Sequence, residues 1–344
     1  MKVLKMKKED RDKFLRAMMQ VGELWAPVKQ GNETRLRYRK IEDPSIIGDK
    51  FNRPILPLKK FLYPPKLPMF KFSEERYEAE IGNVPMRIIF GVTPCDIHAM
   101  LIMDETFMEH YPDPYYIERR EKTIIIGHSC EPDEYCMCKS MGTHYIEEGF
   151  DLAMSDLGDF YLVWIGSSKG HDLTRLVPEL FDENIKDSDI KKYVEWRRKR
   201  DASFEKVFDF TGIPDIMELS YYSPIWEELG EKCLSCGSCV MVCPTCNCFN
   251  VMDELTLSPE VKGERVRYWT TCLFIEHALV AGGHNFRGKR AERVRQFYIH
   301  KLQAFGAEFG SPACVGCGRC VVTCPVNINV WEVVGKLKGK EAYI

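Results

Sequence analysis

The stretch KCLSCGSCVMVCPTCNC, Lys232–Cys248, places six cysteines in 17 residues. Its first four cysteines follow the spacing C-x2-C-x2-C-x3-C-P, and the stretch CVGCGRCVVTCP, beginning at Cys314, repeats that spacing. Three thiolates spaced in this way allow one short loop to wrap three irons of a cubane. The fourth cysteine then leaves for the other cluster in two-cluster proteins. The two runs therefore predict a pair of [4Fe–4S] clusters.

This exchange of the fourth cysteine defines the expected ligand sets. The predicted ligands of the first cluster are Cys233, Cys236, Cys239 and Cys324. The predicted ligands of the second cluster are Cys314, Cys317, Cys320 and Cys243. Gly237, Gly316 and Gly318 let the backbone turn tightly and point N–H groups at cluster sulfurs. A single C-x2-C pair is also typical of zinc ribbons, but two identical four-cysteine runs, each closed by Cys-Pro, are not a zinc pattern.

The composition and the N-terminal sequence indicate a cellular compartment, and the compartment decides how the cysteines are interpreted. The chain has 344 residues, of which 45% are hydrophobic and 29% charged, and its net charge of −3 implies no general attraction to nucleic acid. The longest apolar runs have the length of strands, and the N-terminus lacks the apolar centre of a secretory signal. We therefore expect a cytoplasmic protein. In a reducing cytosol, 15 cysteines favour metal binding or redox chemistry over disulfides.

The 70 residues between Cys243 and Cys314 are too many for the compact link of a small bacterial ferredoxin. Residues Glu276–Ala281 continue an apolar face, and Lys289–Phe305 has apolar residues at helical spacing. The pattern resembles the α-helical ferredoxin domain, in which helices carry both cluster runs.

Three further cysteines of this half, Cys246, Cys248 and Cys272, fall outside the repeated spacing. One interpretation is packing, because free cysteine is a common buried residue. The other is an additional ligand set, with His277 or His284 nearby. The sequence leaves both interpretations open.

A third group lies far upstream and consists of Cys95, Cys130, Cys136 and Cys138. The predicted strand Arg87–Val92 leads to Cys95, with Thr93 as a helix cap and Pro94 at the first helical position. At a helix start, free N–H groups and the helix dipole favour a thiolate. The predicted strand Lys122–Gly127 leads to Cys130, so both loops are expected to leave the same end of one parallel sheet.

Four convergent cysteines predict a third iron–sulfur cluster. The alternatives are zinc, a redox-active dithiol at Cys136 and Cys138, or buried packing. The nearby acids Asp96, Glu131 and Asp133 are interpreted as caps and surface groups rather than as catalysts.

The predicted fold is an α/β or α+β domain over residues 1–215, followed by an α-helical ferredoxin-like two-cluster domain over residues 216–344. Residues 7–20 predict an amphipathic helix, residues 80–166 hold three candidate strands, and residues 187–208 predict a charged helix that links the domains. Residues 51–72 contain five prolines and predict an extended strap rather than a regular helix, either wrapping the first domain or binding a partner.

Two basic runs, Lys191–Arg200 and Arg287–Arg295, are interpreted as solvated faces or as docking sites for an acidic partner. The chain contains no G-x-G-x-x-G after a strand, no P-loop and no G-x-S-x-G, so no nucleotide site and no catalytic residue of its own are predicted. A cluster protein without its own oxidant, reductant or substrate pocket is most simply an electron relay with partners at both ends.

The sequence resembles the iron–sulfur β subunits of the cytoplasmic sulfhydrogenases, which are NAD(P)-linked NiFe hydrogenases, a family that includes the iron–sulfur component of anaerobic sulfite reductase. The resemblance covers nearly the whole chain. It is carried by Ala26–Val28, Cys95–Asp96, CEPDEYCMC at Cys130–Cys138, the opening stretch, AGGHNFR at Ala281–Arg287 and CVGCGRC at Cys314–Cys320. SMGTHY at Ser140–Tyr145 is more similar to the sulfite reductase branch, whereas the CEPDEYC stretch and AGGHNFR are more similar to the hydrogenase branch.

This resemblance implies a circuit. A flavin- and NAD(P)-binding subunit splits hydride into single electrons, this chain relays them, and the small and large hydrogenase subunits receive them. The same relay could instead feed a sirohaem sulfite reductase. A third hypothesis, from another class, is a zinc-stabilised protein that binds nucleic acid through its basic helices. It would be colourless and free of acid-labile sulfide.

Overall fold

The computed structural model describes residues 2–256 and 262–339. Its larger sheet has eight strands in the order β10-β1-β9-β8-β7-β6-β2-β3. The bounds of these strands are β1 Lys2–Lys7, β2 Glu23–Val28, β3 Arg37–Lys40, β6 Arg87–Val92, β7 Thr123–His128, β8 Leu152–Asp156, β9 Phe160–Ile165 and β10 Phe181–Asp182. The central strands β2, β6, β7 and β8 are parallel to one another, and the strands on both sides of them pair antiparallel. Residues 80–166 thus hold four strands of this sheet where three were predicted.

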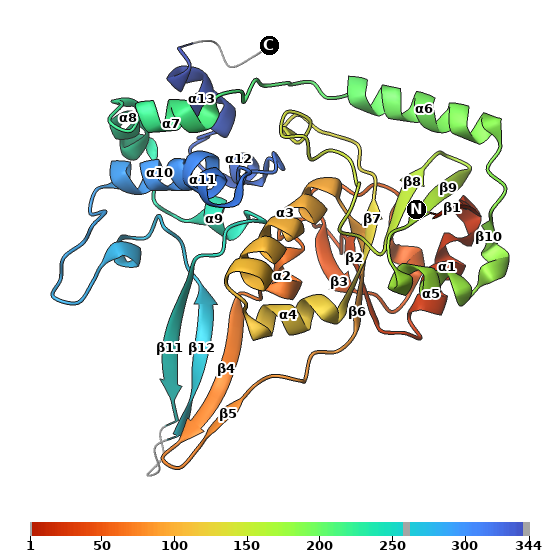
Figure 1. The fold of residues 1–344 in the computed structure, drawn as a ribbon, viewed down its shortest axis with the longest axis horizontal. Coiled ribbons are helices and arrows are strands. Elements are labelled where there is room, and N and C mark those ends of the chain that lie inside the picture. The colour runs from red at the N-terminus through yellow and green to blue at the C-terminus, as the bar shows by residue number, and fades with distance from the viewer. Residues whose placement is uncertain (1, 257–261, 340–344) are drawn as a thin grey trace.

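Helices cover both faces of this sheet (Figure 1). The helices of this half are α1 Arg11–Met18, α2 Lys59–Leu62, α3 Pro94–Asp104, α4 Pro114–Glu121, α5 Ser168–Arg175 and α6 Asp187–Ala202. Short 3-10 turns span Lys8–Asp10, Pro44–Ile46 and Pro178–Leu180, and a π-helical turn, Glu105–His110, extends α3. Because neighbouring strand residues point to opposite faces, each strand supplies two separate cores.

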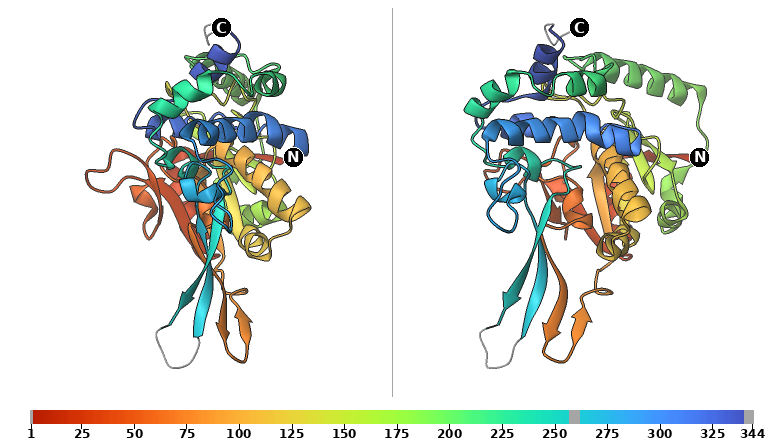
Figure 2. Two further views of the ribbon diagram at one scale, coloured as in Figure 1. Left: turned by 90° about the vertical axis from the view of Figure 1, so that its left-hand side faces the viewer. Right: turned by 60° about the vertical axis from the view of Figure 1, so that its left-hand side comes forward.

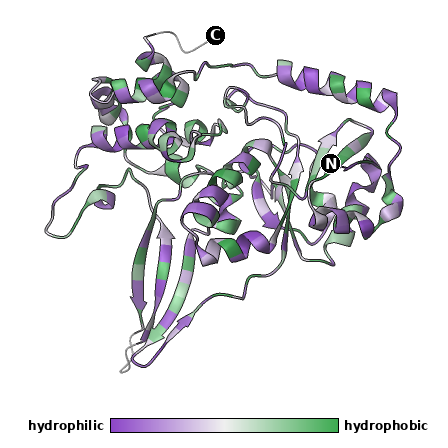
Figure 3. Ribbon diagram, in the orientation of Figure 1, coloured by the Kyte–Doolittle hydropathy of each residue, from purple (hydrophilic) through white to green (hydrophobic). Residues whose placement is uncertain are grey.

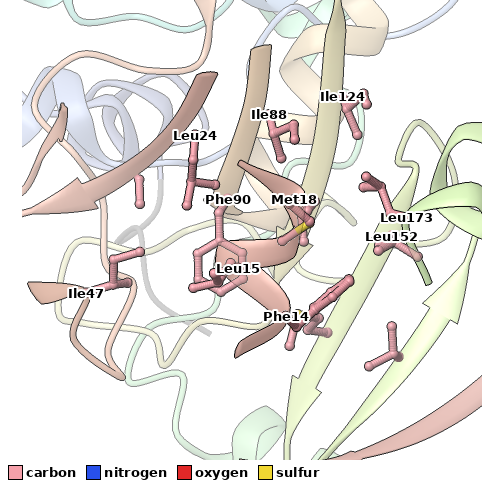
Figure 4. Packing of buried hydrophobic residues seen from close by; sticks show 14 of the residues in the cluster. Phe14, Leu15, Met18, Leu24, Ile47, Ile88, Phe90, Ile124, Leu152 and Leu173 are labelled. Atoms are coloured by element: carbon pink, nitrogen blue, oxygen red, sulfur yellow. The ribbon is translucent and has the colours of Figure 1, made fainter. Parts of the chain in front are cut away.

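The first core lies against α1 and α5 and is shown in Figure 4. Phe14 and Leu15 of α1 pack there with Ile88 and Phe90 of β6. The second core lies on the opposite face, where Ile89 packs with residues of α3 and α4. The near-continuous apolar sequences of β6 and β7 follow from this burial on both faces.

The second sheet has four strands in the order β11-β12-β4-β5. Its strands are β4 Lys66–Ser73, β5 Tyr77–Ala79, β11 Phe249–Leu255 and β12 Lys262–Trp269. β4 pairs antiparallel with β12, so the proline-rich strap is joined to the residues between the two cysteine runs. Figure 2 shows this sheet extending away from the rest of the molecule, and Figure 3 shows hydrophilic and hydrophobic residues mixed along its strands.

Two sequence expectations for these segments were incomplete. The strap is not extended throughout, because Lys59–Leu62 forms one helical turn before β4. The residues between the cysteine runs are not wholly helical: they begin with the β11–β12 hairpin, and residues 276–281 contribute to the 3-10 turn Ile275–Ala278 and to an isolated bridge between Leu279 and Asn285. Hairpin pairing and tertiary contacts override the local apolar spacing here.

The C-terminal half is a group of short helices around both cysteine runs (Figure 1). They are α7 Ile213–Leu219, α8 Ile225–Lys232, α9 Ser238–Met241, α10 Arg290–Ile299, α11 Phe305–Phe309, α12 Arg319–Thr323 and α13 Val330–Leu337. A π-helical segment, His300–Ala304, joins α10 to α11. The predicted helix Lys289–Phe305 therefore exists with a π segment near its end. No helix in the described part of the chain is long and apolar enough to cross a membrane.

Candidate iron–sulfur centres

A first cavity opens beside α9, α10 and the end of α12. Its lining includes five cysteines: Cys233, Cys236, Cys239, Cys320 and Cys324. Apolar side chains such as Leu234, Val294 and Ile328 form much of the remaining wall. Gly237 begins α9 with a φ of +74°, a left-handed conformation that places Cys236 and Cys239 on either side of a sharp turn.

A second cavity lies between the π segment after α10 and the second cysteine run. Its cysteines are Cys243, Cys314, Cys317 and Cys320. Phe297 and Tyr298 line both cavities and therefore stand between them. The structure thus brings the fourth cysteine of each run together with the first three of the other run, and Cys320 lines both cavities.

Burial makes these thiols difficult to ionise without a cation. Burial raises the pKa of Cys239 to about 12, and the thiol groups of Cys233 and Cys243 contribute to the rise. Burial likewise raises the pKa of Cys314 to about 12. Because neighbouring thiolates repel one another in a poorly solvated cavity, they can ionise together only when metal charge is present.

The surrounding backbone fits thiolate-bound clusters as well. The N–H of Ser235 donates to Cys233 Sγ over 3.3 Å, and the N–H of Ile328 donates to Cys324 Sγ over 3.2 Å. Hydrogen bonds to cluster sulfur and exclusion of water both set cluster potentials. Within the described residues, no group of three or more His, Cys, Asp or Glu side chains lies close enough together to hold a single metal ion, whereas each cavity has cysteines spread around its wall.

The upstream cysteines also come together. Cys95 is the second residue of α3, and Cys130 follows β7, so both leave the same end of adjacent parallel strands, as predicted. The Cys136 side chain and burial are the main causes that raise the pKa of Cys138, and the charges of Cys95, Cys130 and Cys136 raise it further. These interactions show that the four thiols share one neighbourhood.

The expected effect of the helix start on Cys95 was wrong. Thr93 and Pro94 occupy the predicted cap and first helical positions, but the Thr93 side chain caps no backbone N–H and lies 3.4 Å from Cys95 Sγ. Burial raises the pKa of Cys95 well above its usual value, and the charges of Asp96 and Cys317 raise it further. Loss of solvation therefore outweighs the helix dipole.

Cys95 and Cys138 also pack against residues that line the second cavity. They share a small buried cluster with Val315 and Cys317, which come from the second cysteine run. The Met137 N–H donates to the Gly316 carbonyl over 2.8 Å. A Cβ at Gly316, whose φ is +64°, would lie 2.5 Å from the Met137 carbonyl carbon, so the close approach requires glycine.

An ion pair buried between the halves corrects the interpretation of Asp96 as a cap or surface group. Asp96 is 1% exposed and accepts two hydrogen bonds from Arg319, over 2.6 and 2.7 Å. Arg319 also donates to the Pro54 carbonyl of the strap over 2.9 Å. Asp133 is likewise engaged, pairing with Arg53, which donates to the Cys317 carbonyl. Glu131 remains an exposed group and pairs with Lys50.

The basic runs contain buried arginines that sequence reasoning placed on solvated faces. Arg200 of α6 is 6% exposed, and its Nε donates to the Cys130 carbonyl over 2.7 Å. Arg293 of α10 is 5% exposed and holds the Leu273 carbonyl. The spacing of Arg200 and Arg293 on charged helices does not indicate that they are buried. Burial of Arg319 could have been predicted, because it lies inside the second cysteine run.

Cys246, Cys248 and Cys272 lie where the β11–β12 hairpin meets the helices. Cys246 is buried, and the other two are partly exposed. In the residues described, no hydrogen bond or ion pair joins His277 or His284 to these cysteines; the pKa of His277 is lowered by burial and by Arg287 alone. The two histidines therefore give no support to an additional ligand set that includes them.

Comparison with known proteins agrees with this geometry. Residues 232–328 match the family model described as a 4Fe-4S dicluster domain, a range that contains both cysteine runs. The chain is also 37% identical to Sulfhydrogenase 2 subunit beta of Pyrococcus furiosus over 338 residues, which are 98% of this chain and 99% of that protein. The chain therefore belongs to the family of sulfhydrogenase β subunits.

Proposed function

We propose that this chain is the iron–sulfur subunit that relays single electrons inside a hydrogenase complex. The observation that carries the proposal is the pair of adjacent cavities, each lined by the first three cysteines of one run and the fourth of the other, with Cys320 lining both. The matched dicluster family and the sulfhydrogenase β relative support the same conclusion. When bound, the two [4Fe–4S] clusters would supply one-electron redox chemistry.

The protein's own part is to hold and insulate these centres. The four thiolates of each predicted set hold a cluster, and backbone N–H groups such as that of Ser235 donate to the ligand sulfurs. Apolar walls would exclude water, and Phe297 and Tyr298, which line both cavities, would lie between the two centres. Placement and local dielectric are the means by which a protein tunes such cofactors.

The upstream cysteines would form a third iron–sulfur centre. Their contact with Cys317 through a shared buried cluster supports a path from the second cluster into the α/β half. Arg200 would hold the Cys130 loop in place through its hydrogen bond to the Cys130 carbonyl. Cys236 of the first set is exposed and Cys130 of the upstream set is partly exposed, so electrons could enter at one of these centres and leave at the other.

Two partners follow from this arrangement. A flavin- and NAD(P)-binding subunit would deliver or receive electrons at one end, and the small and large hydrogenase subunits would do so at the other. The chain itself would bind no nucleotide and catalyse no bond making or breaking. Deleting it should abolish NAD(P)-linked hydrogen turnover and leave dye-linked hydrogenase activity intact.

Iron and acid-labile sulfide per chain, measured on anaerobically purified protein, test the centres directly. We expect about twelve irons for three cubanes, whereas about eight would restrict the relay to the C-terminal half. The ligand exchange has a sharper test, which compares electron paramagnetic resonance spectra of four single variants. Cys324→Ser should change the same signal as Cys233→Ser, and Cys243→Ser the same signal as Cys314→Ser. If Cys324→Ser instead changed the same signal as Cys314→Ser, the exchange of the fourth cysteines would be contradicted.

A further inference from the structure

Two cysteines outside the predicted ligand sets are brought together by the β11–β12 hairpin. Cys248 directly precedes β11, and Cys272 follows β12 by three positions. Phe249 pairs with Trp269 in the hairpin, and the Thr270 N–H donates to the Cys248 carbonyl over 3.0 Å. The hairpin register therefore holds both thiols at one end of the ladder, beside the cluster cavities.

The hairpin makes the two thiols neighbours. The side chain of Cys272 is the largest cause that lowers the pKa of Cys248, to about 6. Cys272 packs against the same buried hydrophobic core as Cys239 and Cys243, which are predicted ligands of the two iron–sulfur clusters. A thiol pair at this place is close to both predicted centres.

Two buried lysines add positive charge to the same region. Lys59 is 5% exposed, donates to the Cys246 carbonyl over 2.8 Å and lies 4.0 Å from the centre of the Trp269 ring. Lys301 is 4% exposed and donates to Thr245 Oγ1 over 2.6 Å. Within residues 2–256 and 262–339, no carboxylate lies within ion-pairing distance of either ammonium group.

Burying two ammonium groups is costly unless negative charge accompanies them. The groups whose charges act on both lysines are sulfurs, including those of Cys243, Cys246 and Cys248. The region is therefore suited to hold anionic sulfur, both at the predicted ligand Cys243 and at the neighbouring Cys246 and Cys248. Cations near a thiol pair stabilise its reduced, thiolate-bearing form and make the corresponding disulfide easier to reduce.

We propose that Cys248 and Cys272 form a reversible disulfide that exchanges electrons with the clusters, an inference that rests on the proposed relay function. On oxidation, one S–S bond would form between Cys248 and Cys272, and the two sulfurs would release two protons and two electrons, the electrons to the one-electron [4Fe–4S] carriers that the predicted ligand sets would hold. On reduction, the disulfide would take up two electrons and two protons, and the S–S bond would break. The pair would thus store two electrons beside one-electron carriers.

Differential thiol labelling of the full chain tests this site. Anaerobic protein is oxidised with a dye that accepts electrons, or reduced with dithionite, and is then denatured and alkylated before peptide mass spectrometry. We expect the peptides of Cys248 and Cys272 to be linked and unlabelled after oxidation, and separate and labelled after reduction. Full labelling of both cysteines in both states would overturn the proposal.

Three variants make the result specific. Cys248→Ser should leave Cys272 labelled in both states, and Cys272→Ser should leave Cys248 labelled in both states, each with unchanged iron content. Cys246→Ser should keep the Cys248–Cys272 link, because its thiol hydrogen-bonds with Cys243 instead. Loss of about four irons in Cys248→Ser or Cys272→Ser would make that residue a cluster ligand and refute the dithiol, while leaving the relay intact. An unsubstituted chain without iron would instead refute the relay itself.

Discussion

Replacing Arg319 with methionine should destabilise the protein far more than a typical arginine substitution. The guanidinium is 1% exposed, and it makes two short hydrogen bonds to Asp96 and a third to the Pro54 carbonyl. Methionine fills part of the space but leaves the Asp96 carboxylate buried without a partner. The ion pair joins residues 223 positions apart, so its loss also weakens the contact between the two halves.

The expected magnitude follows from this burial. Removing one partner of a buried ion pair costs about 3–5 kcal/mol in the free energy of unfolding, because an uncompensated charge remains. A matched control is Arg265→Met, which breaks the pair with Asp253 over 2.7 Å, where the side chains are 44% and 39% exposed. Exposed pairs contribute about 0–1 kcal/mol, so the two substitutions differ mainly in burial.

The measurement is denaturant unfolding of anaerobic, cluster-loaded protein, followed by tryptophan fluorescence and by iron retention. The double variant Asp96→Leu with Arg319→Met removes both charges and should recover much of the stability lost in the single variant. Because Asp96 adjoins Cys95, the single variant should also lose iron from the upstream centre first. The reasoning fails if Arg319→Met unfolds like Arg265→Met, or if the double variant is no more stable than the single one.

Further predictions concern the close approach of the two halves, the main core and the cluster potentials. Gly316→Ala should lower stability and the iron content of the upstream centre much more than Gly310→Ala does. Both glycines have a positive φ, but of the two only Gly316 lies against the backbone of another segment. Equal losses of iron in the two variants would contradict this prediction. Phe14→Ala should cost about 3–5 kcal/mol in denaturant unfolding, since its ring is fully buried against the main sheet, and a cost below about 1 kcal/mol would exclude that packing. Lys301→Met should lower the midpoint potential of the nearest cluster in a spectroscopic redox titration, because a buried positive charge favours the reduced centre. The control Lys301→Arg keeps the charge and should preserve the potential. An unchanged potential in Lys301→Met would exclude this role for Lys301.

Local sequence was sufficient wherever the chemistry depends on spacing within one short loop. The two C-x2-C-x2-C-x3-C-P runs predicted two clusters, and the matched dicluster family covers both runs. The alternation of strand and helix around Cys95 and Cys130 likewise predicted that both would leave one end of a parallel sheet. These features are local because a ligand loop or a helix start is determined by a few consecutive residues.

The tertiary structure alone decided how distant segments meet. No spacing rule relates Asp96 to Arg319, or β4 to β12, or the upstream cysteines to Cys317. The burial of Arg200 and Lys301 is equally invisible in sequence, because a charged residue on a helix is normally solvated and only packing by other elements removes that water. The cysteine sequence thus determined which cofactor the chain can hold, whereas the fold decided which charges, thiols and backbones surround it, since burial and close contact arise only when segments far apart in the chain pack together.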